Sequence, residues 1–237
     1  MNDSAITGLK ASYLLQTAGG QVQLVDTDAA GDGNDGTDTF VGIETIQFKD
    51  QSMGIVSPII LDLDSDGVQT VSAADSNARF DMNGDGNRDD TSWISNGDGF
   101  LFLDRDENGT LSGIAEMSFT IDVAGAATDL KGLAAFDSNG DEKISAADQR
   151  FDQFMVWHDA NGNGNVDAGE ILSLADIGLA EISLAAAATK LAVGVDGVAV
   201  VNNGEWISVD GRSMGLADAV MTFTPGVGHG KGGAPVI

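Results

Sequence analysis

Short alternations of apolar and polar residues at the two ends of the chain are the pattern of half-buried β-strands. Near the N-terminus, the segments 10–16 and 21–26 flank a hairpin signal at Gly19-Gly20, and the segment 41–48 alternates in the same way. Two glycines between two such segments favour a tight turn. The N-terminal region is therefore predicted to be β-structure.

The C-terminal part of the chain returns to the strand pattern over residues 179–223. Asp196-Gly197 and Asp210-Gly211 each stand between apolar segments. An Asp-Gly pair in this position favours a two-residue hairpin turn. We expect C-terminal β-hairpins here.

Between these two regions, apolar residues recur at helical intervals in three segments, 128–136, 146–157 and 170–177. Gly178 follows the third segment and is a typical residue just beyond the end of a helix. Short helices between regions of strands predict an α+β fold.

The charge of the chain adds a requirement to this picture. Asp and Glu number 37 and Lys and Arg 11, which gives a net charge of −26. Such an excess indicates disorder, adaptation to high salt or bound cations. The hydrophobic share is 42% and is gathered into strand-like and helix-like segments, so bound cations are the preferred explanation.

Composition also excludes several classes of function. The negative charge repels nucleic acid and anionic membranes, and no stretch of 18 apolar residues is present that could span a membrane. The chain has no cysteine, which excludes zinc–thiolate sites, disulfides and thiol nucleophiles. We expect neither nucleic acid nor a membrane as a partner.

Loops rich in Asp, Asn and Gly carry the clearest chemistry. An EF-hand loop of about twelve residues offers calcium oxygens from positions 1, 3, 5, 7, 9 and 12, with glycine at position 6. The segment DANGNGNVDAGE (159–170) fits at every position, with Gly164 at position 6 and Val166 at position 8. Its predicted calcium ligands are Asp159, Asn161, Asn163, the carbonyl of Asn165, Asp167 (directly or through water) and Glu170.

A second loop, DSNGDEKISAAD (137–148), follows the pattern with two departures. Its predicted ligands are Asp137, Asn139, Asp141, the carbonyl of Lys143, Ser145 and Asp148. Glu142 takes the place of the turn glycine, and the shorter Asp148 replaces glutamate at position 12, which favours a weaker site. We expect Ile144 and Val166 to pair side by side between the two loops, as in paired EF-hands.

Three further loops share the opening of the pattern without glutamate at position 12. Loop 62–70 offers Asp62, Asp64, Asp66 and the carbonyl of Val68. Loop 81–89 offers Asp81, Asn83, Asp85, the carbonyl of Asn87, and Asp89. Loop 104–116 offers Asp104, Asp106, Asn108, the carbonyl of Thr110, Ser112 and Glu116, which comes one place late. Each loop has glycine at position 6, namely Gly67, Gly86 and Gly109.

The segments SPIILDLDSDGVQTVS, FDMNGDGNRDDTSW, DGFLFLDRDENGTLSG, LAAFDSNGDEKIS and VWHDANGNGNVDAGEILSLADIGL occur in this order. Over about residues 57–185 they resemble the calcium-binding self-processing module of iron-regulated repeats-in-toxin (RTX) proteins. GTDTFVGIETIQF (36–48) resembles the end of an RTX β-roll, with one degenerate repeat at 31–39.

We therefore expect three parts: a β region at 1–56 that resembles the end of an RTX β-roll, an EF-hand-like calcium-binding module at 57–224 with short helices, and a flexible Gly-rich tail at 225–237. Because β-structure begins at the first residues, we interpret the chain as a piece of a longer protein. The resemblance implies a secreted parent protein, exported by type I secretion machinery, with Ca²⁺ as the cofactor and folding driven by extracellular calcium.

The resemblance also raises the question of an enzymatic activity. In self-processing members, an Asp-Pro bond ahead of the first loop breaks when calcium binds. The matching bond here is Ser57-Pro58, and the chain has no Asp-Pro bond. We predict a structural or linking module that does not cleave itself. The alternatives are a calcium-triggered autoprocessing module and a part of a calcium-dependent adhesin, whose surface ligand the sequence does not name.

Overall fold

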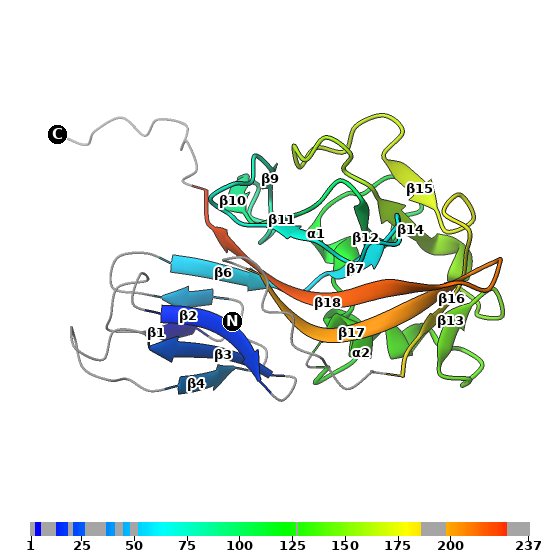
Figure 1. Cartoon of the computed structure of the whole chain (residues 1–237), viewed down its shortest axis with the longest axis horizontal. Coiled ribbons are helices and arrows are strands. Elements are labelled where there is room, and N and C mark those ends of the chain that lie inside the picture. The colour runs from blue at the N-terminus through cyan, green and yellow to red at the C-terminus, as the bar shows by residue number, and fades with distance from the viewer. Residues whose placement is uncertain are drawn as a thin grey trace.

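The computed structural model describes residues 3–5, 13–18, 21–26, 37–40, 45–47, 52–126, 128–185 and 198–226. Within these residues the regular elements are mostly β-strands in antiparallel pairs, and each helix is a short turn (Figure 1). None of these helices is long and apolar enough to cross a lipid bilayer.

The largest sheet combines strands from both ends of the chain. Along its main path the strands, in spatial order, are β1 (Asp3–Ala5), β5 (Thr45–Gln47), β6 (Ser52–Val56), β18 (Ser213–Thr224), β7 (Ile59–Asp62), β12 (Asp98–Leu103), β14 (Phe154–Trp157) and β15 (Ile171–Ser173). Shorter branches are made by β9 (Arg79–Phe80), β10 (Asp89–Thr91), β13 (Lys143–Ser145), β16 (Leu179–Ser183) and β17 (Val198–Ser208). Two small sheets pair β8 (Thr70–Val71) with β11 (Trp93–Ile94), and β2 (Tyr13–Ala18) with β3 (Gln21–Asp26) and β4 (Thr37–Phe40).

Strand β18 joins the parts of this architecture. It pairs antiparallel with β6, β7, β10 and β17, and the β17–β18 hairpin crosses the molecule as its longest feature (Figure 1). In the hairpin turn Gly211 has φ +83, and the N–H of Ser208 donates to the carbonyl of Arg212 at 2.9 Å. A turn does form at Asp210-Gly211 as predicted, but it has three residues, 209–211, where two were expected.

The N-terminal hairpin is confirmed in its strands, because β2 and β3 pair antiparallel with Ala18 opposite Gln21. The turn predicted at Asp196-Gly197 lies outside the described residues. So do residues 31–36 of the degenerate repeat and residues 227–237 of the tail.

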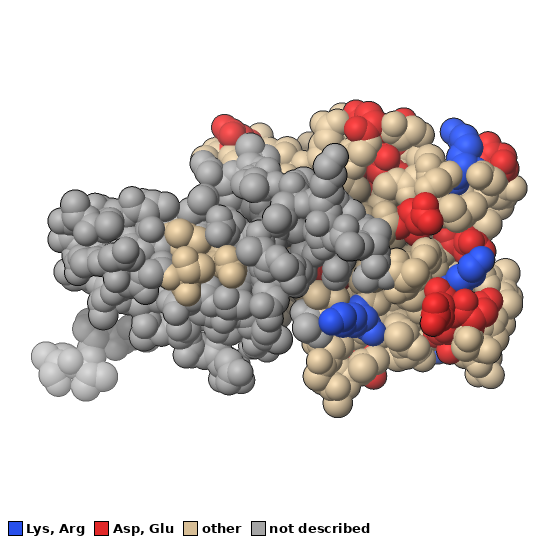
Figure 2. All heavy atoms as spheres, turned by 60° about the horizontal axis from the view of Figure 1, so that its bottom comes forward, with Lys and Arg blue, Asp and Glu red and all other residues tan. Residues whose placement is uncertain are grey.

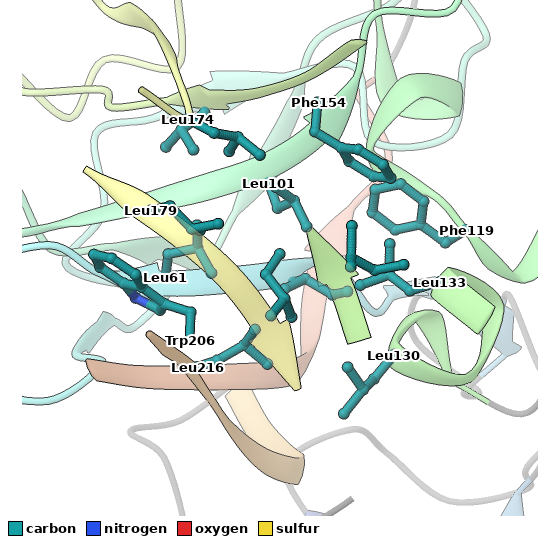
Figure 3. Packing of buried hydrophobic residues seen from close by; sticks show 14 of the residues in the cluster. Leu61, Leu101, Phe119, Leu130, Leu133, Phe154, Leu174, Leu179, Trp206 and Leu216 are labelled. Carbon is teal, nitrogen blue, oxygen red and sulfur yellow. The ribbon is translucent and has the colours of Figure 1, made fainter. Parts of the chain in front are cut away.

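The central strands are buried on both faces, between two hydrophobic cores. In β7 and β12, Leu61 and Leu101 face the first core, while Ile60 and Phe100 face the second. Figure 3 shows the first core, where Trp206 lies at one end beside Leu61 and Leu179, and Phe119 and Phe154 lie at the other end. Because both faces of these strands are covered, every residue of β7 and β12 is buried. Strands in this position have nearly continuous apolar sequences.

The α+β prediction is wrong, because the fold is mostly β. In the described part of the chain the two α-helices, α1 (Ile114–Met117) and α2 (Asp129–Gly132), have one turn each, and there are 3₁₀ turns at Thr120–Asp122, Leu133–Phe136 and Phe151–Gln153. Of the three predicted helices, 128–136 is therefore reduced to α2 and one 3₁₀ turn. EF-hand-like loops are present without the flanking helices of an EF-hand.

The segment 146–157 ends in strand β14 rather than in a helix. Phe154 and Val156 face the first core, while Trp157 and the partly buried Met155 face the second. An apolar run with both faces covered cannot be told from a buried helix by periodicity. The apolar residues of this segment therefore occur on both faces of a strand, because each face packs against a different core.

The segment 170–177 is also not helical. It forms strand β15 and then a turn in which the carboxylate of Asp176 accepts the N–H of Ser173 at 2.9 Å. Gly178 does adopt a left-handed conformation, at φ +68, but it follows this turn.

The predicted pairing of Ile144 with Val166 is wrong as well. Ile144 lies opposite Ile182 in the β13–β16 pair and belongs to the first core. Val166 packs against the second core. The two loops therefore stand on different cores and do not form a paired EF-hand.

Candidate metal-binding loops

All five Asp-rich loops are wound in the same way. In each, the carboxylate at position 1 accepts the backbone N–H at position 6, so the loop closes on its first side chain. The donors and acceptors are Gly67 to Asp62 at 3.0 Å, Gly86 to Asp81 at 2.8 Å, Gly109 to Asp104 at 2.8 Å, Glu142 to Asp137 at 3.0 Å and Gly164 to Asp159 at 2.7 Å. The common conformation follows from the sequence pattern.

Position 6 is left-handed in every loop. The φ values are +91 for Gly67, +87 for Gly86, +77 for Gly109, +63 for Glu142 and +71 for Gly164. Left-handed backbone suits glycine and costs other residues about 1–2 kcal/mol. Glu142 therefore takes the turn conformation in spite of its side chain, and loop 137–148 keeps the shape of the others.

Among the described residues, two groups of three carboxylates bring one oxygen each within 4.8 Å of one another. The first group is Asp62, Asp64 and Asp66 of loop 62–70. A shared hydrogen bond with Asp64, partial desolvation, and the charges of Asp64 and Asp62 raise the pKa of the exposed Asp66. The raised pKa reflects the crowding of negative charge in this loop.

The second group is Asp104, Asp106 and Glu116 of loop 104–116. Although Glu116 comes one place late for an EF-hand, its buried carboxylate turns back to the loop. It accepts the N–H of Ser112 at 2.7 Å and the N–H of Arg105 at 2.9 Å. The short helix α1 holds Glu116 in this position.

Loop 81–89 is hydrogen-bonded to the residues that follow strand β18. Its last predicted ligand, Asp89, is fully buried and accepts the N–H of Met82 and the N–H of Gly226, both at 2.8 Å. Burial raises the pKa of Asp89, against the effect of these two donors, and the charges of Asp85 and Asp81 add to the rise.

In loop 137–148 the closing carboxylate lies inside the loop. Oδ1 of Asp148 accepts the N–H of Ser138 at 2.8 Å, and Oδ2 accepts the N–H of Ser145 at 2.9 Å. Burial alone would raise the pKa of Asp148, but the donors of Ser145 and Ser138 outweigh it and lower the pKa. The shorter side chain thus reaches the loop interior.

In loop 159–170 two side-chain amides face one carboxylate. The side-chain amides of Asn161 and Asn163 each donate to Oδ2 of Asp167 at 2.9 Å, and they lower its pKa. Glu170 is buried and accepts the N–H of Asp167 at 3.0 Å. The amides therefore offset part of the negative charge inside the loop that best matches an EF-hand.

Loops 81–89 and 159–170 are in direct contact. The guanidinium of Arg88 donates to the carbonyl of Gly164 at 2.6 Å, and also to Oδ1 of Asn165 and the carbonyl of Arg79. The N–H of Arg79 donates to the carbonyl of Asn163 at 3.3 Å. One arginine therefore links two of the candidate sites.

Sequence reasoning missed one carboxylate, that of Asp98. It is fully buried at the start of β12, directly opposite Asp62 in the β7–β12 register. Burial raises its pKa to about 6, against the hydrogen bonds from Gln69 and Ser95, and the charges of Asp62 and Asp64 add to the rise. No loop spacing marks Asp98, because the sheet register alone brings it to loop 62–70.

Acidic side chains also gather on the surface. Figure 2 shows several red patches on the described part of one face, with few basic side chains between them. Together, the fold and the loops define a mostly antiparallel β module that carries a series of EF-hand-type loops.

Comparison with known proteins gives this class a family. The SPM domain matches residues 59–222, so the chain belongs to the SPM domain family. It is also 33% identical over 172 residues to the iron-regulated protein FrpA of Neisseria meningitidis serogroup C. The match covers 70% of this chain and 15% of that relative. Both matches support an RTX-related module, as the sequence predicted.

Proposed function

We propose that this chain is a calcium-binding module of a secreted RTX-type protein, and that extracellular calcium drives its folding. The observation that carries the proposal is the pair of three-carboxylate groups in loops 62–70 and 104–116, each already closed on its first aspartate. The proposed role is structural, as a linking part of the parent protein.

The chemistry of the donors supports calcium. The predicted ligands are carboxylate, amide, hydroxyl and carbonyl oxygens, which hard cations prefer. Calcium binds oxygens at about 2.4 Å, so two oxygens on opposite sides of one ion are about 4.8 Å apart. The two carboxylate groups lie within this limit. The smaller Mg²⁺ usually keeps several waters and uses one or two carboxylates, which favours calcium.

The net charge of −26 supports calcium-driven folding. Without cations the carboxylates repel one another in the compact state. Binding occurs in the folded state, so its free energy stabilises the fold. A site with a Kd of ~10 μM in ~1 mM calcium contributes about 2.7 kcal/mol. Several such sites decide whether the module folds, and a loose chain inside the cell suits export by a type I secretion machinery.

We also propose that this chain does not cleave itself. The bond that corresponds to the processed one is Ser57-Pro58, between β6 and β7. Pro58 is buried, and its carbonyl accepts the N–H of Ala219 at 3.1 Å. The side chain of Ser57 lacks the carboxylate that attacks in self-processing members. After incubation with calcium, a denaturing gel is expected to show one intact band; two fragments that meet at this bond would overturn the proposal.

The central test is a calcium titration of chelator-treated protein, followed by far-UV circular dichroism and urea denaturation. Ordered signal and a rise in the free energy of unfolding are expected between micromolar and millimolar calcium, with a smaller response to magnesium. Protein that is fully ordered in chelator and unchanged by calcium would contradict the proposal.

Two variants relate the response to the loops. Glu116→Gln removes one charge from the second carboxylate group and is expected to weaken calcium binding at least tenfold at that site. Asp152→Asn is the matched control, because Asp152 is exposed and outside the loops. Equal titration curves for the two variants would show that the loop carboxylates do not bind the ion.

A further inference from the structure

Loop 62–70 has the opening ligands of a calcium site but no closing acidic residue of its own. Asp62, Asp64 and Asp66 bring their oxygens within 4.8 Å of one another. In an EF-hand loop, a carboxylate at position 12 completes the shell around the ion. The corresponding residue here would be Ala73, which has no oxygen in its side chain.

The neighbouring strand brings a further buried carboxylate beside this group. Asp98 is opposite Asp62 in the antiparallel β7–β12 pair, so both side chains stand on the same face of the sheet, with Cβ atoms about 5 Å apart. Oδ2 of Asp98 accepts the N–H of Gln69, inside the loop, at 2.9 Å. Asp98 therefore already holds the far end of loop 62–70.

The two oxygens of the Asp98 carboxylate differ in their hydrogen bonds. Oδ2 is engaged by Gln69 and by the hydroxyl of Ser95, also at 2.9 Å. In the part of the chain that the structure describes, Oδ1 of Asp98 is buried and has no hydrogen-bond partner. A buried carboxylate oxygen without a donor is costly. A cation shared with the loop would remove this cost.

The strand also fits closely around the loop at Gly97. A Cβ atom at this position would come within 2.4 Å of Oδ2 of Asp64. The N–H of Leu63 donates to the carbonyl of Gly97 at 3.1 Å. The absence of a side chain at Gly97 thus leaves room for the Asp64 carboxylate beside β12.

We infer that Asp98 is the closing carboxylate of a calcium site whose other ligands come from loop 62–70. The site is shared between β12 and a loop that follows β7, and the sheet register assembles it. This inference rests on the proposed calcium-binding function and deepens it by assigning a ligand outside the loops.

The test is the number of calcium ions bound, counted by native mass spectrometry and checked by isothermal titration calorimetry. Asp98→Asn is expected to bind one ion fewer than the wild-type chain, because the amide keeps the acceptor for Gln69 but loses the charge. Asp64→Asn is expected to lose one ion too. The double variant is expected to lose the same single ion, which shows that the two residues share a site.

Asp152→Asn is the control for the loss of one charge and is expected to keep every ion. Should Asp98→Asn fail to fold in calcium, Gly97→Ala decides, because its methyl group displaces Asp64 without changing a charge; it is expected to lose one ion. The inference is overturned if a folded Asp98→Asn variant, or Gly97→Ala, binds as many calcium ions as the wild-type chain with the same affinity. A wild-type chain that binds no calcium instead overturns the proposed function.

Discussion

The indole N–H of Trp93 donates a hydrogen bond of 2.8 Å to Oδ2 of Asp159, the first residue of loop 159–170. Both side chains are buried, and Trp93 packs edge-on against Trp157 in the second core. The indole N–H of Trp157 in turn donates to Glu170 at 3.4 Å, at the other end of the loop. The second core is therefore in direct contact with both ends of a candidate calcium site.

This contact predicts a fluorescence signal from calcium binding. A change of charge at Asp159 or Glu170 alters the field at the attached indoles, so tryptophan emission is expected to change during a calcium titration. Trp93→Phe keeps an aromatic ring but removes the N–H, and it is expected to lose the part of this change that arises at Trp93 and to weaken binding, while Trp157 still contacts Glu170. Phe119→Leu, a change in the first core, is the control: it is expected to lower stability and keep the signal. An undiminished signal in Trp93→Phe would show that Asp159 does not respond to the ion.

The left-handed conformation of Glu142 predicts a stabilising substitution. Its φ of +63 costs about 1–2 kcal/mol, a cost that is absent for glycine. Glycine in turn lowers the stability by about 0.5–1 kcal/mol, because it gives the unfolded chain more conformational freedom. Glu142→Gly is therefore expected to raise the free energy of unfolding by about 0.5–1 kcal/mol in urea denaturation. Gly86→Ala is the converse variant: Gly86 has φ +87 and open space around it, so a loss of stability is expected. A destabilised Glu142→Gly variant would contradict this account.

Asp129 predicts a pH dependence of stability. Burial raises its pKa from 3.8 to about 7, and the charge of Asp218 adds to the rise, against the N–H donors of Thr120 and Phe119. Between these two pH values the folded state holds the proton more tightly than the unfolded state, so stability is expected to fall as the pH rises from about 4 to 7. The loss is on the order of a few kcal/mol.

Asp129→Asn tests this pH dependence, because the amide oxygen still accepts from the N–H groups of Phe119 and Thr120, both at 2.6 Å. The difference in unfolding free energy between variant and wild type is expected to grow in favour of the variant from pH 4 to pH 7 and to stay constant above. Asp152→Asn, measured alongside, is the control for the loss of an exposed carboxylate. A flat difference for Asp129→Asn would refute the assignment.

Arg88 predicts an energetic coupling between loops 81–89 and 159–170. Hydrogen bonds to charged groups contribute about 1.5–3 kcal/mol, and Arg88 donates to Gly164 and Asn165 of the second loop. Arg88 is exposed, so Arg88→Ala is expected to lower the free energy of unfolding by about 1 kcal/mol and to weaken calcium binding at loop 159–170. Arg212→Ala is the control, because the exposed pair Arg212–Asp210 contributes less than about 1 kcal/mol. Equal effects of the two substitutions would show that the loops are independent.

The sequence by itself determined the local conformation of the loops. Position 1 and position 6 are five residues apart, and the hydrogen bond between them depends on a carboxylate and a left-handed residue at those places. The turn at Asp210-Gly211 is local in the same sense. These features were predictable because the interacting groups are close neighbours along the chain.

Only the tertiary structure decided whether the segments between the loops are helices or strands. It also decided which distant residues contact the loops. Phe154–Trp157 has an apolar pattern that suits a helix or a strand, and its position between two cores makes it a strand. Asp98 meets loop 62–70, and Trp93 meets Asp159, through the pairing and packing of distant strands. Such contacts depend on sheet register and on which faces are covered, and neither is encoded in the spacing of a single segment.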